Sequence, residues 1–145
     1  MTDPFNLERF VEAQAGGTYS QALSELQLGR KRSHWMWFIF PQIAGLGSIP
    51  TAVRYAINSL AEAQAYLLHG VLGPRLLECS LAVATHTASS AVDILGSTDA
   101  RKLHSSMTLF LRAAPGESVF KTVLAQFFDG EPDAATDALL AAGRD

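Results

Sequence analysis

Apolar residues recur along most of this chain at the three- and four-residue spacing of amphipathic helices. The longest such stripe is formed by Leu103, Met107, Phe110 and Leu111, which recur at i, i+4, i+7 and i+8. Similar stripes occur at Tyr19, Ala22, Leu23 and Leu26, and at Val119, Phe120, Val123, Leu124 and Phe127. Because runs of β-branched residues are few, we expect an all-α fold of seven or eight helices in one domain, residues 1–145.

Helix boundaries follow from capping residues and glycines. Helix starts are predicted at Asp3-Pro4, at Thr18 through a capping box with Gln21, at Ser59 through one with Glu62, at Ser90, at Ser97 or Thr98, and at Asp133. Gly16-Gly17, Gly29 and Gly70 are predicted to end helices. The apolar run 33–41 is too short for periodicity to distinguish helix from strand, and we favour a short helix because its neighbours are helical.

Composition and charge restrict the class of protein. With 48% hydrophobic and 17% charged residues in 145, the chain is typical of a compact globular domain. A net charge of −3 and a pI near 5.7 argue against binding to duplex nucleic acid. The sequence lacks a long apolar run and a signal peptide, so we expect a cytoplasmic protein without membrane contact. The single cysteine, Cys79, is expected to pack in the core.

The segment 29–42 departs from this acidic background. The cationic residues Arg30, Lys31 and Arg32 are followed by His34 and both tryptophans, Trp35 and Trp37, and no acidic residue occurs between Glu25 and Glu62. Cationic groups favour an anion and indoles stack on flat rings, so the pattern indicates a site for a small anionic molecule that contains a ring. The alternative is that basic residues at a helix end only complement its dipole.

Two further segments are candidates for the same site. The loop after Pro41 carries Gln42, Gly45 and Gly47, and its glycines would let backbone amides approach a ligand; an ordinary connection is the alternative. On the predicted helix from Thr98, an amine and two hydroxyls group together, namely Lys102, Ser105 and Ser106. They could hold a phosphate or sugar, or form a solvated helix face. The four histidines show no metal-ligand spacing, so we propose no metal and no cofactor.

The segments 31–42 and 102–110 resemble the bacterial domain-of-unknown-function 1810 family. Further segments of resemblance are 3–5, 10–14, Ala52-Val53-Arg54-Tyr55, 60–67 and 72–76. The resemblance implies a multihelical fold and a site that includes His34, Trp35, Trp37, Gln42, Lys102, Ser105 and Ser106; Tyr55 is added as a candidate ligand-binding residue. It implies no established activity. Some members are labelled calpastatin, an unfolded and highly charged inhibitor, which does not fit this apolar chain.

Residues 61–64 also resemble helical proteins associated with NAD and ADP-ribose that cleave N-glycosidic bonds. That resemblance implies Glu62 or Glu12 as an acid–base group, the basic triplet on a pyrophosphate and a tryptophan stacked on a base. Whether the protein is an enzyme stays open, as does its oligomeric state.

Three hypotheses follow. The first is a pocket for a nucleotide-like ligand where the His34 segment meets the Lys102 helix. The second is a protein-interaction module whose exposed aromatic patch, Trp35, Trp37 and Phe38, is rimmed by arginines. In the third, both tryptophans only fill the core.

Overall fold

The computed structural model describes residues 2–143. These residues form ten helices, more than the seven or eight predicted. They are α1 (Glu8–Ala13), α2 (Thr18–Leu28), α3 (Met36–Ile39), α4 (Pro50–Arg54), α5 (Leu60–Leu68), α6 (Leu72–Ala84), α7 (Ala91–Leu95), α8 (Ser97–Ala113), α9 (Ser118–Phe127) and α10 (Ala134–Ala142). Over the same residues there is no strand beyond an isolated parallel bridge between Ile43 and Ile57, so the all-α class is confirmed. The predicted domain, 1–145, extends slightly past the described residues at both ends.

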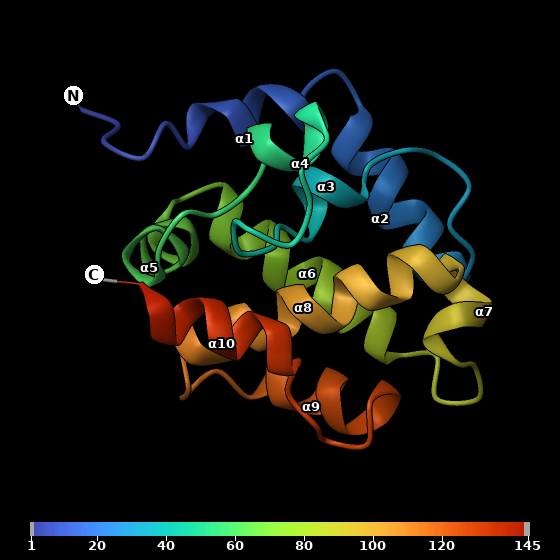
Figure 1. The fold of residues 1–145 in the computed structure, drawn as a ribbon. Coiled ribbons are helices and arrows are strands. Elements are labelled where there is room, and N and C mark those ends of the chain that lie inside the picture. Colours follow the sequence, from blue (N-terminus) through green and yellow to red (C-terminus); the bar gives the residue numbers. More distant parts are fainter. Residues whose placement is uncertain (1, 144–145) are drawn as a thin grey trace.

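Helix α8 is the central element of the molecule (Figure 1). It packs against α5, α7, α9 and α10, and α6 packs against α2, α5 and α9. Of the stripe predicted on α8, Leu103, Met107 and Phe110 are fully enclosed, and Leu111 is partly buried. Buried apolar side chains from every described helix except α4 and α10 join one cluster. Burial of this apolar surface is the main stabilising contribution to such a fold.

Several helix starts agree with the predicted caps. The Ser59 and Ser90 side chains accept hydrogen bonds from the backbone amides of Glu62 and Asp93. The Asp133 carboxylate accepts one from the backbone amide of Thr136. Thr18 does not cap α2, because Gly17 is the N-cap and Thr18 is the first helical residue. Similarly, Gly96 precedes α8.

The segment between α3 and α4 positions the candidate site. It leaves α3 at Phe40, and the amide of Ala44 donates to the carbonyl of Ile57 at 2.8 Å. In return, the amide of Ile57 donates to the carbonyl of Gln42, also at 2.8 Å. Gln42 and Ala44 are therefore tied to Ile57, just after α4, whereas Gly45 and Gly47 beyond this bridge are exposed.

Candidate functional site

The basic segment begins where α2 ends and is anchored by a buried carboxylate. Gly29 ends α2 with a left-handed φ of 77°, as predicted. Glu25, 2% exposed, accepts hydrogen bonds from the amides of Arg32 and Ser33, at 2.7 and 3.0 Å, and from the Ser33 hydroxyl. It also accepts one from the Trp35 indole at 2.9 Å and one from Gln21 at 2.7 Å. Glu25 therefore fixes the path of the chain into α3.

These hydrogen bonds determine the protonation of Glu25. Burial by itself would raise the pKa of the carboxyl group, because a charged form is poorly solvated in the interior. The donors from Ser33, Arg32 and Gln21 oppose that effect, and the pKa lies well below its ordinary value. Glu25 is accordingly an ionised structural group at neutral pH.

A second carboxylate, Asp99, joins the two segments singled out in the sequence. Its Oδ2 lies 2.9 Å from Lys31 Nζ, and its Oδ1 lies 3.1 Å from Lys102 Nζ. Partial burial raises the pKa of Asp99, but the two ammonium groups outweigh it and lower the pKa overall. Each lysine also lies over an indole: Lys31 is 5.2 Å from the Trp35 ring centre, and Lys102 is 3.8 Å from that of Trp37. Asp99 thus holds the basic segment and α8 together.

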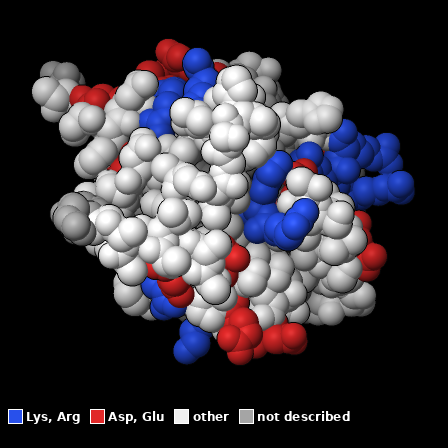
Figure 2. Space-filling model, in the orientation of Figure 1, with Lys and Arg blue, Asp and Glu red and all other residues white. Residues whose placement is uncertain are grey.

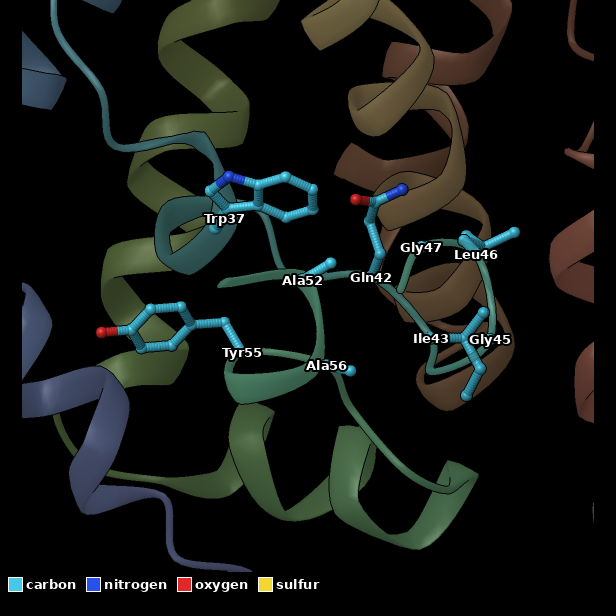
Figure 3. A pocket seen from close by; sticks show the side chains of 9 residues that line it. All are labelled: Trp37, Gln42, Ile43, Gly45, Leu46, Gly47, Ala52, Tyr55 and Ala56. Atoms are coloured by element: carbon cyan, nitrogen blue, oxygen red, sulfur yellow. The ribbon is translucent and has the colours of Figure 1, made fainter. Parts of the chain in front are cut away.

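A surface hollow of about 470 Å³ opens beside this contact. We call it the Trp37–Lys102 hollow. Its lining consists of Trp37, Gln42, Leu46, Gly47, Thr98, Arg101, Lys102, Ser105, Asp133 and Ala135. A pocket of about 20 Å³ adjoins it and shares Trp37, Gln42, Leu46 and Gly47; Figure 3 shows the Trp37 indole extended towards the Gln42 amide, with the glycine loop beyond.

Five of the predicted site residues meet in this hollow. They come from remote parts of the chain: Trp37 and Gln42 from the segment 29–42, Gly47 from the loop after it, and Lys102 and Ser105 from α8. Gly45 and Tyr55 line the adjoining pocket. The expected convergence of the two segments is therefore present, although it is centred on Trp37 and not on His34.

The other predicted site residues lie elsewhere. Trp35 is a core residue, 1% exposed, which matches the core-filling hypothesis for this indole. His34 lines a separate hollow of about 380 Å³ beside Gly17 and Gln21. Arg30 and Arg32 are exposed, whereas Lys31 is partly buried and forms an ion pair with Asp99. Ser106 is fully buried, and its hydroxyl has no hydrogen-bond partner within residues 2–143.

Three charged residues at the site were not predicted. Arg101 and Asp133 line the Trp37–Lys102 hollow, and Asp99 orients Lys102 beside it. Arg101 is exposed, and its guanidinium has no ion pair or hydrogen bond to any described residue. On the face drawn in Figure 2, Lys and Arg atoms form two neighbouring groups on the right-hand half, with a small acidic area between them.

The glutamates expected as acid–base groups do not line the hollow. Glu62 is 2% exposed and pairs with Arg9 at 2.7 Å, and its other oxygen accepts the amide of Asn58 at 3.0 Å. Arg9 in turn donates to four backbone carbonyls, those of Phe5, Asn6, Arg54 and Ala56. This buried ion pair ties α1 to the end of α4 and the start of α5. Glu12 is exposed on α1.

Other predicted features were located as follows. Cys79 is buried, as expected, and burial raises the pKa of its thiol to about 12. Within residues 2–143 no three His, Cys, Asp or Glu side chains cluster closely enough to hold a metal ion. In the same range no single helix has the length and apolar character to cross a membrane; α5 and α6 meet that test only as a pair, bent by 90°.

Two of the comparisons with known proteins found a match. The chain is similar to the conserved hypothetical protein Rv1873 from Mycobacterium tuberculosis, whose crystal structure superposes with a TM-score of 0.93 at 55% sequence identity. The match covers 96% of this chain and 99% of the mycobacterial one. No curated protein matches the chain. Residues 4–140 match the family described as "Protein of unknown function (DUF1810)", and the chain belongs to that family.

Proposed function

We propose that the Trp37–Lys102 hollow binds a small anionic molecule that carries a ring, nucleotide-like and related to NAD or ADP-ribose in its chemistry. The observation that carries this proposal is the shared lining: an indole, an amide and two cationic side chains border one hollow of about 470 Å³. Small-molecule sites typically measure about 300 to 1,000 Å³ and combine apolar walls with a few polar groups.

The cationic side of the hollow supports an anionic ligand. Lys102 Nζ is fixed by Asp99 at 3.1 Å and by the Trp37 ring at 3.8 Å. An ammonium has three donors, so Lys102 keeps hydrogen-bonding capacity after it binds Asp99. Arg101 lines the same hollow with its full set of donors available. Three cationic side chains, Lys31, Arg101 and Lys102, and two carboxylates, Asp99 and Asp133, leave a smaller but still positive local charge.

The aromatic side supports a ring-containing ligand. Trp37 is half-buried, so part of its indole is accessible from the hollow. Leu46 and the Trp37 ring supply apolar contact area, while the Gln42 amide has both a donor and an acceptor for the edge of a ring. The burial of Trp35 removes one of the three aromatic residues of the protein-interaction hypothesis, which weighs towards a small ligand.

The test is calorimetry and thermal shift with AMP, NAD, ADP-ribose and inorganic phosphate. Arg101→Ala and Lys102→Ala should each weaken binding about tenfold, because each removes a hydrogen bond to a charged group. Lys121→Ala, which removes an exposed lysine on α9, is the matched control and should bind like the parent. The proposal fails if none of the four probes binds, or if Lys121→Ala weakens binding as much as Lys102→Ala.

A further inference from the structure

The lining of the Trp37–Lys102 hollow includes an acidic residue, which a simple anion site would not require. Asp133, the N-cap of α10, lines the hollow together with Ser105. Its Oδ2 accepts the Thr136 amide at 3.1 Å and the Thr136 hydroxyl at 2.6 Å. Its Oδ1 has no hydrogen-bond partner in the described part of the chain, although a carboxylate oxygen can accept two.

The position of this carboxylate is fixed by α8. The amide of Asp133 donates to Thr108 Oγ1 at 2.8 Å, and Thr108 Oγ1 donates to the carbonyl of His104 at 2.8 Å. Thr108 is fully buried, so this connection lies in the interior. Asp133 is therefore preorganised relative to Arg101 and Lys102, which are on the same helix as Thr108.

The hydroxyl of Ser105 also presents an acceptor. Thr136 Oγ1 lies 3.1 Å from Ser105 Oγ and 2.6 Å from Asp133 Oδ2. A carboxylate only accepts, so Thr136 gives its single hydroxyl proton to Asp133. The Ser105 proton is then directed to Thr136, and the lone pairs of Ser105 Oγ remain as acceptors at the lining of the hollow, where Ser105 is 2% exposed.

The lining of the hollow thus combines cationic donors with fixed acceptors. A bare anion satisfies the donors but meets Asp133 as a like charge. A phosphorylated sugar satisfies both, since its phosphate accepts hydrogen bonds and its hydroxyls donate them. Carboxylates bind ribose hydroxyls in the same way in dinucleotide-binding folds.

Building on the proposed function, we infer that the hollow recognises the ribose phosphate portion of a ribonucleotide. The phosphate binds Arg101 and Lys102, and neighbouring ribose hydroxyls donate to Asp133 Oδ1 and Ser105 Oγ. The ring of the base contacts Trp37 and Gln42. The site therefore selects for a free 2′-hydroxyl as well as for negative charge.

The first experiment compares AMP with 2′-deoxy-AMP, which differs by that hydroxyl alone, and with inorganic phosphate, all by calorimetry. We expect AMP to bind about tenfold more tightly than 2′-deoxy-AMP, because the deoxy compound leaves a charged acceptor without its donor. Equal binding of AMP and 2′-deoxy-AMP overturns the inference and leaves the proposed function standing. If neither nucleotide nor phosphate binds, both fail.

The second experiment uses Asp133→Asn. Asparagine caps a helix as well as aspartate does, so α10 should be retained, which circular dichroism checks. The variant should bind AMP and 2′-deoxy-AMP alike, with the affinity for inorganic phosphate unchanged or increased. Asp137→Asn, on the same helix but paired with Arg112 away from the hollow, is the control and should keep the preference. A preference for AMP that survives in Asp133→Asn contradicts the inference, as does tighter binding of a zwitterion such as glycine than of AMP.

Discussion

At the scale of single residues, Glu25 determines how the basic segment is presented. Five hydrogen bonds end on its two carboxylate oxygens, and four of the donors belong to Arg32, Ser33 and Trp35. Three residues of the basic segment are thus anchored by donating hydrogen bonds to the carboxylate of Glu25. Trp35 is therefore a structural residue, and its burial places its neighbour Trp37 at the surface hollow.

Glu25→Gln tests this role. The amide replaces one acceptor oxygen with a donor, which then faces donors in a buried site. We expect the free energy of unfolding to fall by about 3 kcal/mol, because buried donors would lose their charged acceptor. Urea denaturation followed by tryptophan fluorescence measures it. Glu12→Gln, at an exposed position on α1, should change stability by less than about 0.5 kcal/mol. Equal stability of the two variants would show that Glu25 does not anchor the segment.

At the scale of elements, the contact between α5 and α6 depends on one glycine. A Cβ on Gly73 would lie 2.1 Å from the backbone oxygen of Leu67, which is far inside van der Waals contact. The obstructing atom is backbone and cannot move without displacing α5. Glycine at this position therefore permits a close approach of the two helices.

Gly73→Ala should for that reason reverse the usual sign of a glycine-to-alanine change in a helix. Alanine normally stabilises a helix by about 1 kcal/mol, whereas here we expect a loss of about 3 kcal/mol from overpacking. Gly70→Ala is the matched control, because its Cβ would meet no atom within 4 Å. Thermal unfolding of both variants tests this prediction. A Gly73→Ala protein as stable as the parent would show that α5 and α6 can move apart without a loss of stability.

The elements also show which features the sequence could predict. Long helices with a wide apolar stripe, such as α8, were predicted because the periodicity is repeated over several turns. The cap at Ser90 was predicted because its side chain acts locally. Helix α4 was not predicted, since Pro50–Arg54 is too short for a periodic signal. Thr18 was assigned as a cap because a capping pattern does not reveal that Gly17, with φ of 87°, takes the N-cap position instead.

The candidate site was predictable only in part, for a related reason. The residue types of Trp37 and Lys102 indicated their chemistry, but their contact depends on where the fold places α8 relative to the segment that carries Trp37. Asp99, Arg101 and Asp133 occupy positions that are common for charged residues on helix surfaces and at caps, so nothing in the sequence separates them from solvated side chains. Their roles emerge only from the distances that the fold creates.

At the scale of the whole molecule, the shifted pKa values limit stability at both ends of the pH range. The pKa values of Glu25, Asp99 and Asp137 are lowered in the folded state. Each therefore contributes stability that is complete above its unfolded pKa, about 4, and is lost as the pH falls through the folded value. Burial raises the pKa of Cys79 to about 12 and also raises those of Tyr19 and Tyr66. Their contributions are complete below their unfolded values, about 8.5 to 10, and are lost as the pH rises.

The predicted profile of Tm against pH is thus a plateau from about pH 5 to pH 8 that falls on both sides. Thermal unfolding between pH 2.5 and pH 10.5, at constant ionic strength, gives this profile directly. Glu25→Gln provides the internal check on the acid side, because the variant has no titratable carboxyl group at position 25. Its deficit relative to the parent should be largest on the plateau and should narrow below about pH 4, because protonation of Glu25 in the unfolded state then favours unfolding of the parent, whereas the glutamine of the variant takes up no proton. A deficit that stays constant down to pH 2.5 would show that the Glu25 carboxylate does not contribute to acid sensitivity, and the acid limb would then have to arise from Asp99 and Asp137.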